Sequence, residues 1–404
     1  MVRDNNLNIY KVWFVILLTF CSISISEAAF NTGVYPGESF IDPTASINVT
    51  DFSIGSESYI APFTSFSGNY TYIGSYSNVQ DSGSNEGRIT IDDDAVVAHG
   101  AELSGDIEIG SRAFVGFNSI IKDSKIGDGA YIGIASKIIG IDIPAGKSVL
   151  PGSIIDSPDD IEKLRPVDEA QIEFVKEVIE VNRALAIGYT KLFEKSGLGA
   201  FGKVGPHGDA DIIIDGKDIL AHSGSHEPTV GEGTTIGEAR VIGHVILGEN
   251  ISIEDGTSIR GDEGIPLAIG DNSQIGKNNT FHSLNGKEII IGRNFKINSE
   301  SVVHGPVTIG SDVTVGSHSV VFKSTIGNNV VIGDNAVVVG VEVPDGTFIP
   351  PGSMIQTRKD VRLLNPVAIA PGTGSAPITD MFFVAMIPIL IGLTVSLVLR
   401  KKEH

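Results

Sequence analysis

Cysteine is almost absent from this sequence: Cys21 is the single one among 404 residues. One cysteine cannot build a disulfide framework, and it excludes zinc or iron–sulfur sites made of several thiolates. A metal ion in this protein would therefore need histidine and carboxylate ligands, and the sequence offers 9 histidines.

Aromatic and basic residues are also scarce. Aromatics make up 7% of the chain, and 29 Lys and Arg stand against 49 Asp and Glu, for a formal charge of -20. Nucleic-acid binding needs clustered basic side chains to neutralise phosphates, so the acidic balance excludes nucleic acid as the expected partner. Apolar residues still reach 41%, enough for a sizeable core rather than a disordered chain. The 48 glycines indicate β structure with tight turns.

Residues 1–29 are predicted to form a secretory signal peptide. Arg3 and Lys11 provide a basic start, residues 12–20 are apolar, and small residues near Ala28 offer a cleavage site. An uncleaved membrane anchor is the alternative. Cleavage would remove Cys21 and leave the mature protein without cysteine.

Residues 381–399 are predicted to form a transmembrane helix. They carry no charge and come close to the roughly 20 residues that cross a bilayer. The basic residues 400–402 follow at once, which predicts a cytoplasmic C-terminus. A buried helix of a soluble protein is the alternative, and the basic flank argues against it. With residues 358–380 as a tether, we expect a single-pass protein of the cell membrane with an extracytoplasmic body.

A six-residue period dominates the body of the chain. An aliphatic residue followed by glycine recurs at Ile73, Ile109, Val115, Ile126, Ile132, Val230, Ile236, Ile242, Leu247, Ile269, Ile275, Ile309, Val315, Ile326 and Ile332. Six residues with one inward aliphatic make a short strand plus a turn, so three units close a triangular coil of about eighteen residues. The pattern predicts a parallel β-helix, and the left-handed form is the one associated with it.

The repeat is itself duplicated. Residues 144–153 recur as 344–353, and the aliphatic–glycine pairs from Ile109 to Ile132 recur 200 residues later. The segment between the copies has a helical apolar pattern, which we expect to pack along the flank of a β-helix. The predicted fold is therefore all-β, with two left-handed parallel β-helix domains, a connecting α-helix and the C-terminal transmembrane helix. The predicted ranges are 36–155 for the first β-helix, 159–197 for the helical segment, 198–227 for a linker and 228–357 for the second β-helix.

Motifs in the second β-helix resemble a known family. They are Ile259-Arg-Gly-Asp-Glu-Gly-Ile-Pro, His282-Ser-Leu and Val303-His-Gly-Pro, with a weaker match in the first β-helix through Asn78-Val-Gln-Asp and Ala98-His. The family is the γ-class carbonic anhydrases, left-handed β-helix trimers with a metal at the contact between subunits. The resemblance implies reversible hydration of carbon dioxide to bicarbonate and zinc as the metal, with iron or cobalt as alternatives. It also implies a homo-oligomer with trimeric packing of β-helix domains.

The resemblance also implies the ligand set. Family sites take two histidines from one β-helix and a third from its neighbour, and the third lies five positions before the second. His282 and His304 match the first pair, but Ser299 stands five positions before His304. With the offset of 200, Ser299 corresponds to His99, and His304 corresponds to Ser104. Each copy keeps a ligand that the other has lost, which predicts a composite site of His99, His282 and His304.

Further site residues follow from the same resemblance. Three neutral imidazoles leave a fourth zinc position open for water, whose pKa zinc lowers to roughly 7. Gln80 matches a glutamine near that water, and Glu263 matches a site glutamate that is a candidate proton acceptor. Arg260 and Asp262 match a pair at the subunit contact, with a purely structural salt bridge as the alternative. The short loop after His282 resembles the branch of the family without an acidic shuttle loop.

Two other functions fit the same repeat. One is a non-catalytic scaffold subunit, and the other is an acyltransferase that uses one interfacial histidine as a base and binds a pantetheine arm. Complementary losses between the two copies favour the enzyme over random decay. Two β-helices per chain leave the trimer to be completed by several chains or by another β-helix protein. The remaining histidines are expected on the surface or in the linker: His207, His222, His226, His244, His318 and His404.

Overall fold

The computed structural model describes residues 33–35, 37–205, 213–214, 217–218, 227–263, 266–283 and 287–364. The predicted signal peptide and transmembrane segment lie outside these residues, as do most of the predicted linker and tether. His207, His222, His226 and His404 also lie outside them. In the described part of the chain, no helix is long and apolar enough to cross a membrane.

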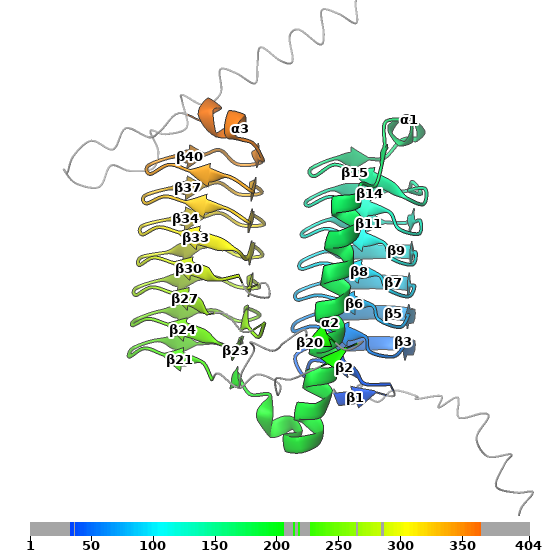
Figure 1. Cartoon of the computed structure of the whole chain (residues 1–404), viewed down its shortest axis with the longest axis horizontal. Helices are drawn as coiled ribbons and strands as arrows, with labels where there is room; N and C mark the ends of the chain where they lie inside the picture. Colours follow the sequence, from blue (N-terminus) through cyan, green and yellow to red (C-terminus); the bar gives the residue numbers. More distant parts are fainter. Residues whose placement is uncertain are drawn as a thin grey trace, which may run out of the picture. The chain divides into compact units, whose positions relative to one another are not determined.

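The first β-helix is a stack of short strands that pair almost entirely in parallel (Figure 1). One sheet faces the second β-helix and is called the first contact sheet. It consists of β1 (Gly33–Tyr35), β2 (Ser39–Ile41), β4 (Tyr59–Ile60), β6 (Asn78–Val79), β8 (Val96–Val97), β10 (Phe114–Val115), β13 (Tyr131–Ile132), β15 (Lys147–Val149) and β17 (Arg165–Pro166). Another sheet consists of β16 (Ile154–Ile155), β14 (Lys137–Ile139), β11 (Ile120–Lys122), β9 (Glu102–Ile109), β7 (Ser84–Ile91), β5 (Ser65–Ile73) and β3 (Ser46–Ile54), with β12 (Lys125–Ile126) paired to β9. Antiparallel pairing occurs at the two ends of the first contact sheet, where β1 meets β2 and β17 meets β15.

The second β-helix has three parallel walls. One wall, called the second contact sheet, consists of β18 (Val204–Gly205), β23 (Arg240–Gly243), β26 (Ser258–Gly261), β29 (Thr280–His282), β32 (Val302–His304), β35 (Val320–Phe322), β38 (Val337–Val339) and β41 (Met354–Ile355). A further wall consists of β21 (Thr229–Val230), β24 (Val245–Leu247), β27 (Leu267–Ile269), β30 (Ile289–Ile291), β33 (Val307–Ile309), β36 (Thr325–Ile326) and β39 (Glu342–Val343). The last wall consists of β22 (Thr235–Ile236), β25 (Ser252–Ile253), β28 (Gln274–Ile275), β31 (Lys296–Ile297), β34 (Thr314–Val315), β37 (Val331–Ile332) and β40 (Phe348–Ile349). Two short strands, β19 (Ile213–Ile214) and β20 (Lys217–Asp218), pair with each other separately.

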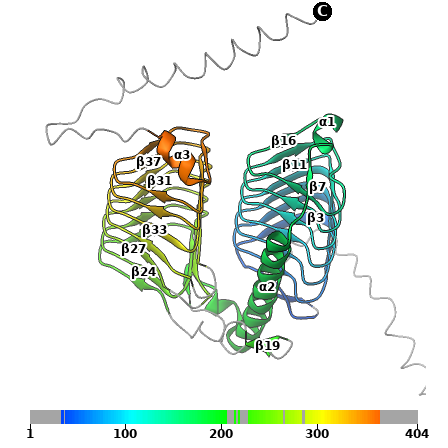
Figure 2. The ribbon, with the colours of Figure 1, turned by 45° about the horizontal axis from the view of Figure 1, so that its top comes forward.

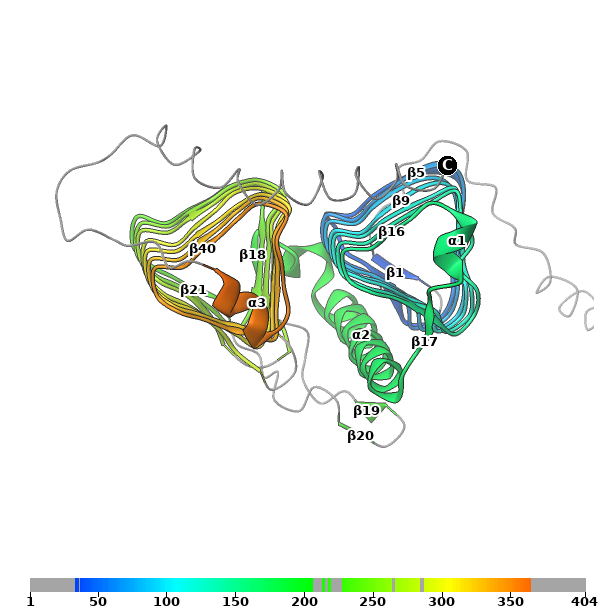
Figure 3. The same cartoon turned by 90° about the horizontal axis from the view of Figure 1, so that it is seen from above.

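Viewed along its stack, each β-helix is a triangle, as the six-residue period predicts (Figure 3). An apolar residue of each unit points inward and forms a column: Phe281, Val303 and Val321 follow one another in register and are fully buried. The glycine after the aliphatic residue has a steric role. A Cβ on Gly316 would lie 2.4 Å from the backbone nitrogen of Asp334 in the next coil. The aliphatic–glycine pair therefore combines core filling with close stacking of coils.

The segment predicted as helix over 159–197 divides in the structure. A short helix α1 (Pro158–Ile161) and strand β17 precede the long helix α2 (Glu169–Ser196). Helix α2 begins with a capping box in which Asp168 and Gln171 each accept from the other's backbone N–H. A 3-10 turn, η1 (Gly197–Ala200), follows α2, and helix α3 (Arg358–Leu363) follows the second β-helix.

Helix α2 runs along the first β-helix (Figure 2). Its residues Leu185 and Tyr189 pack with Phe40 and Tyr59 of the first contact sheet. Farther toward its N-terminus, Val175 packs in a cluster that also holds side chains of the second contact sheet. The expected packing along a flank is thus present, and the helix also contacts the second β-helix.

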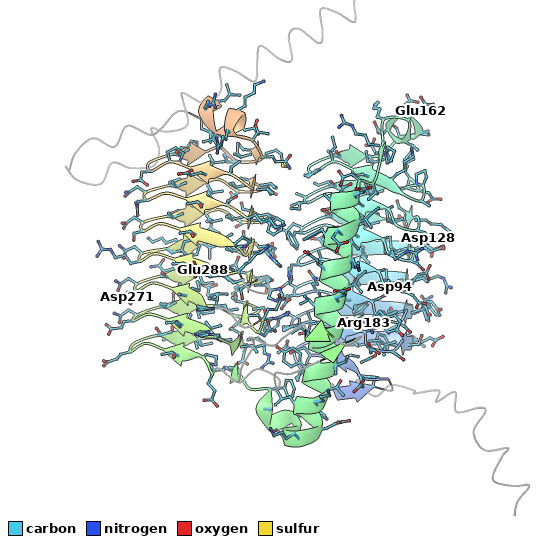
Figure 4. The ribbon with its side chains drawn as sticks, viewed as in Figure 1. Asp94, Asp128, Glu162, Arg183, Asp271 and Glu288 are labelled. Carbon is cyan, nitrogen blue, oxygen red and sulfur yellow. The ribbon has the colours of Figure 1, made fainter. Side chains whose placement is uncertain are left out.

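Acidic side chains are spread over the outside of the coils. Asp128 and Asp271, labelled in Figure 4, are both exposed. Arg183 of α2 is mostly buried, and it pairs with Glu57 of the first β-helix at 2.7 Å. The acidic surplus of the sequence is therefore compatible with the aliphatic core, because water can solvate these carboxylates.

Candidate metal centre

His282 and His304 occupy equivalent positions on consecutive coils of the second β-helix. They end β29 and β32 and are register partners in the parallel ladder. Successive side chains of a strand point to opposite faces, so the inward Phe281 and Val303 place both histidines on the outer face. Two imidazoles therefore project side by side from the second contact sheet.

His99 reaches the same place from the first β-helix. It lies just after β8, and its imidazole is fully buried. The Nε2 atom of His99 is 3.3 Å from Nδ1 of His282, and the three histidines each place one nitrogen within 4.8 Å of the others. The structure thus assembles the predicted triad between the two β-helices of a single chain.

One nitrogen of each ring faces an oxygen and leaves the other for the shared centre. Nδ1 of His99 lies 3.0 Å from Oδ2 of Asp81, and Nδ1 of His304 lies 3.4 Å from the carbonyl oxygen of Gly305. For His282 the engaged atom is Nε2, which leaves Nδ1 toward His99. Such second contacts hold the tautomer and the orientation of a metal-binding imidazole.

Two carboxylates surround Nε2 of His282. Oε1 of Glu263 lies at 3.0 Å and Oδ1 of Asp262 lies at 3.3 Å from it. Both carboxylates are essentially buried, at 1% and 0% exposure. These are two of the four residues predicted beside the ligands, and both contact the same histidine directly.

Arg260 connects the two β-helices at this point. Its Nη1 donates to Oδ2 of Asp81 at 2.6 Å, and its Nε donates to Oδ2 of Asp262 at 2.9 Å. Ser258 donates to the other oxygen of Asp81 at 2.6 Å. Because Asp81 belongs to the first β-helix, the predicted Arg260–Asp262 pair is part of a buried network that also orients His99.

Burial and neighbouring charges shift the pKa values of the carboxylate and the imidazoles. Burial raises the pKa of Asp81, but the Arg260 guanidinium and the bond to His99 outweigh it and hold that pKa well below its usual range. Burial lowers the pKa of His99 to about 4 and that of His304 well below its ordinary value. Neutral imidazoles at neutral pH are the form that binds a metal.

His282 differs from the other two histidines. Burial and the nearby Arg260 lower its pKa, but Glu263 and Asp262 outweigh them and raise it to about 9. A metal ion at the centre would therefore have to displace a proton from Nδ1 of His282, whereas the carboxylates would keep the proton on Nε2.

An apolar wall closes another side of the triad. The ring of Phe117 stacks on His99 at 5.5 Å and on His304 at 5.0 Å between centroids. Phe322 meets His304 edge-on at 5.4 Å. The centre therefore has charged residues on one side and aromatic rings on another.

Several of these neighbours were missed by the sequence analysis, although a spacing could have revealed them. Asp81, His99 and Phe117 are 18 residues apart, which is one coil of the β-helix. Phe322 likewise follows His304 by 18 residues and is its register partner. Residues one coil apart share a face, so a search at this spacing from His99 and His304 finds these flanking residues, whereas the coils around His282 are 22 residues long.

The remaining predicted residues fall in distinct places. Gln80 is buried at 4% exposure, directly before Asp81, and its role near a metal-bound water stays a prediction. Ser299 lies beside Ser317, with their hydroxyl oxygens 3.5 Å apart, and is not part of the triad. His318 is half exposed and pairs with Glu300 at 2.8 Å, while His244 is partly buried.

Comparison with known proteins decides the family. A carbonic anhydrase from Methanosarcina thermophila is 34% identical over 178 residues, which cover 37% of this chain and 72% of that protein. This chain belongs to the γ-class carbonic anhydrase family. The resemblance read from the motifs is thereby confirmed.

Other relatives share the repeat. The family model described as bacterial transferase hexapeptide (six repeats) matches residues 288–323. The carboxysome assembly protein CcmM of Nostoc sp. is 31% identical over 185 residues, which cover 42% of this γ-class chain and 32% of that protein. The chain thus spans about a third of the length of that relative. A solved hexapeptide transferase family protein from Anaplasma phagocytophilum is 23% identical, covers 37% of this chain and 91% of its own, and gives a TM-score of 0.29.

The donor set of the triad fits zinc. Tetrahedral zinc with nitrogen ligands at about 2.05 Å separates two ligand nitrogens by about 3.3 Å. Nε2 of His99 and Nδ1 of His282 are 3.3 Å apart, and all three ligand nitrogens lie within 4.8 Å of one another. All three imidazoles are buried, and His99 and His282 each have a carboxylate oxygen at the ring nitrogen that faces away from the centre, as metal-binding histidines usually do.

Proposed function

We propose that this protein is a zinc-dependent carbonic anhydrase that reversibly hydrates carbon dioxide to bicarbonate. The observation that carries the proposal is the buried triad of His99, His282 and His304, assembled from two β-helices in a chain of the γ-class family. Three imidazole ligands with an open fourth position are the pattern of catalytic zinc rather than structural zinc.

The protein residues divide the work around the triad. Bound zinc would supply Lewis acidity and lower the pKa of water to roughly 7. Glu263, at 3.0 Å from His282, is the proposed proton acceptor, and Gln80 is proposed to orient the reacting water. Phe117 and Phe322 present an apolar surface next to His304, which suits an apolar substrate such as carbon dioxide.

Metal content and carbon dioxide hydration of the purified full chain test this function together. We expect about one zinc per chain and a hydration rate far above that of buffer, both abolished by a strong chelator and restored by zinc. Iron or cobalt in place of zinc, with activity retained, would change only the metal. A chain that binds zinc at the triad but does not hydrate carbon dioxide would contradict the enzymatic proposal.

A scaffold is the second candidate, because one relative is a carboxysome assembly protein. Under that function the triad would hold the two β-helices together rather than bind substrate. The same experiment separates the two, since a scaffold keeps its zinc without hydration activity. The transferase repeat model covers residues 288–323, which lie in the coils of the second β-helix.

We also propose trimeric packing of β-helix domains between chains. The intrachain contact joins non-equivalent faces, since the offset of 200 matches β10 of the first contact sheet to β34 and β32 of the second contact sheet to β9. Each β-helix therefore uses a different face in this contact. The face that its partner uses stays available on it for contact with a further domain. We expect a mass above that of one chain in light scattering of the full chain. A strictly monomeric protein would contradict the proposal.

The predicted location rests on segments outside the described residues. Residues 1–29 and 381–399 support a body exported from the cytoplasm and held at the cell membrane. Protease treatment of intact cells would digest such a body, whereas a cytoplasmic protein would be protected.

A further inference from the structure

Helix α2 reaches the metal centre through Tyr189. This residue is 2% exposed, and its hydroxyl donates to Oδ2 of Asp262 at 2.5 Å. The ring is held by stacking against Phe40 at 5.4 Å and Tyr59 at 5.8 Å between centroids. A group on the connecting helix, outside both β-helices, therefore touches the network behind His282.

The hydroxyl shares one oxygen of Asp262 with the guanidinium. Oδ2 accepts from Tyr189 and from Nε of Arg260, which places Oδ1 toward Nε2 of His282 at 3.3 Å. Rotation of the carboxylate would break both bonds to Oδ2 in a buried place where no water replaces them. The two donors therefore hold Oδ1 at the histidine.

Tyr189 can act only as a donor to Asp262. Burial raises its pKa well above the ordinary value, and the Asp262 carboxylate raises it further. The hydroxyl is therefore the donor of the hydrogen bond that Oδ2 of Asp262 accepts.

We propose that Tyr189 is a positioning residue of the metal centre: its hydroxyl orients Asp262, which keeps Nε2 of His282 engaged and turns Nδ1 toward His99 and His304. This rests on the proposed zinc site and extends it to the connecting helix. The helix is then a part of the site rather than only a link between two domains.

The experiment compares Tyr189→Phe with Tyr59→Phe in the full chain. Both rings are buried and stacked on each other, but the Tyr59 hydroxyl has no hydrogen-bond partner among the described residues. Zinc affinity is measured by competition with a chelator, and thermal unfolding of the metal-free chains monitors the fold. We expect about tenfold weaker zinc binding for Tyr189→Phe, the low end of the effect of outer-shell partners, and unchanged binding for Tyr59→Phe.

A double variant tests the route of the effect. If Tyr189 acts through Asp262, adding Tyr189→Phe to Asp262→Ala weakens zinc binding no further. Equal affinity of Tyr189→Phe and the unaltered chain, equal losses in the two tyrosine variants, or additive losses in the double variant would overturn the proposal. An unaltered chain that binds neither zinc nor cobalt would overturn it together with the zinc site. A chain that binds zinc without hydrating carbon dioxide overturns only the proposed function.

Discussion

Replacing His99 with alanine is expected to remove most of the zinc and to lower kcat/KM for carbon dioxide hydration by more than about 100-fold. This exceeds the usual loss when a hydrogen-bond partner of a metal ligand is replaced. Two histidines of the second β-helix would remain, one fewer than the three protein ligands of a catalytic zinc site. His99 lies 183 residues before His282, the triad member nearest to it in the sequence. Metal analysis and stopped-flow hydration of the full chain provide the measurement.

His318→Ala is the matched control for this experiment. His318 belongs to the same β-helix as two ligands, but it is half exposed and pairs with Glu300 on the surface. Zinc content and activity should match those of the unaltered chain. Retention of full zinc by His99→Ala would contradict the composite site, even if activity fell.

Replacing Arg260 with leucine is expected to destabilise the chain by about 3–5 kcal/mol, because it leaves buried carboxylates without a cation. Asp81 and Asp262 are both fully buried, and each accepts a hydrogen bond from this guanidinium. Urea unfolding followed by circular dichroism measures the change as a lower midpoint. Arg260→Lys should recover little of it, since one ammonium cannot reproduce the fork that spans two carboxylates.

The control for this prediction is Arg88→Leu. Arg88 lies 3.9 Å from Asp106, but both side chains are more than half exposed, so solvent screens the pair. Its unfolding midpoint should fall far less, since the variant loses only this screened pair and an exposed contact of the guanidinium with the ring of Tyr70. Equal midpoints for the Arg260 and Arg88 variants would show that the buried network adds no stability to the contact between the β-helices.

The triad could be found before the structure because duplication left a numerical trace. His282 and His304 stand in family motifs, and the offset of 200 carries Ser299 onto His99. The partner of Arg260 on the first β-helix could not be found in this way. Asp81 lies 179 residues away on the other β-helix, and a motif records only neighbours in its own segment. Tyr189 was missed for the same reason, since a helical apolar pattern predicts burial but not the group that a hydroxyl meets.

The coils of this protein follow from the sequence alone, because the six-residue units carry an inward apolar residue and many of them a glycine directly after it. Stacking of coils then needs only neighbours within about eighteen residues, a range in which periodicity is a sufficient guide. The number of chains in the metal centre was open at that level, since residue spacing does not say which β-helices meet. The tertiary structure decided it by packing two outer faces of one chain together. Burial of Arg260 between Asp81 and Asp262 joins those faces and brings His99 to His282 and His304.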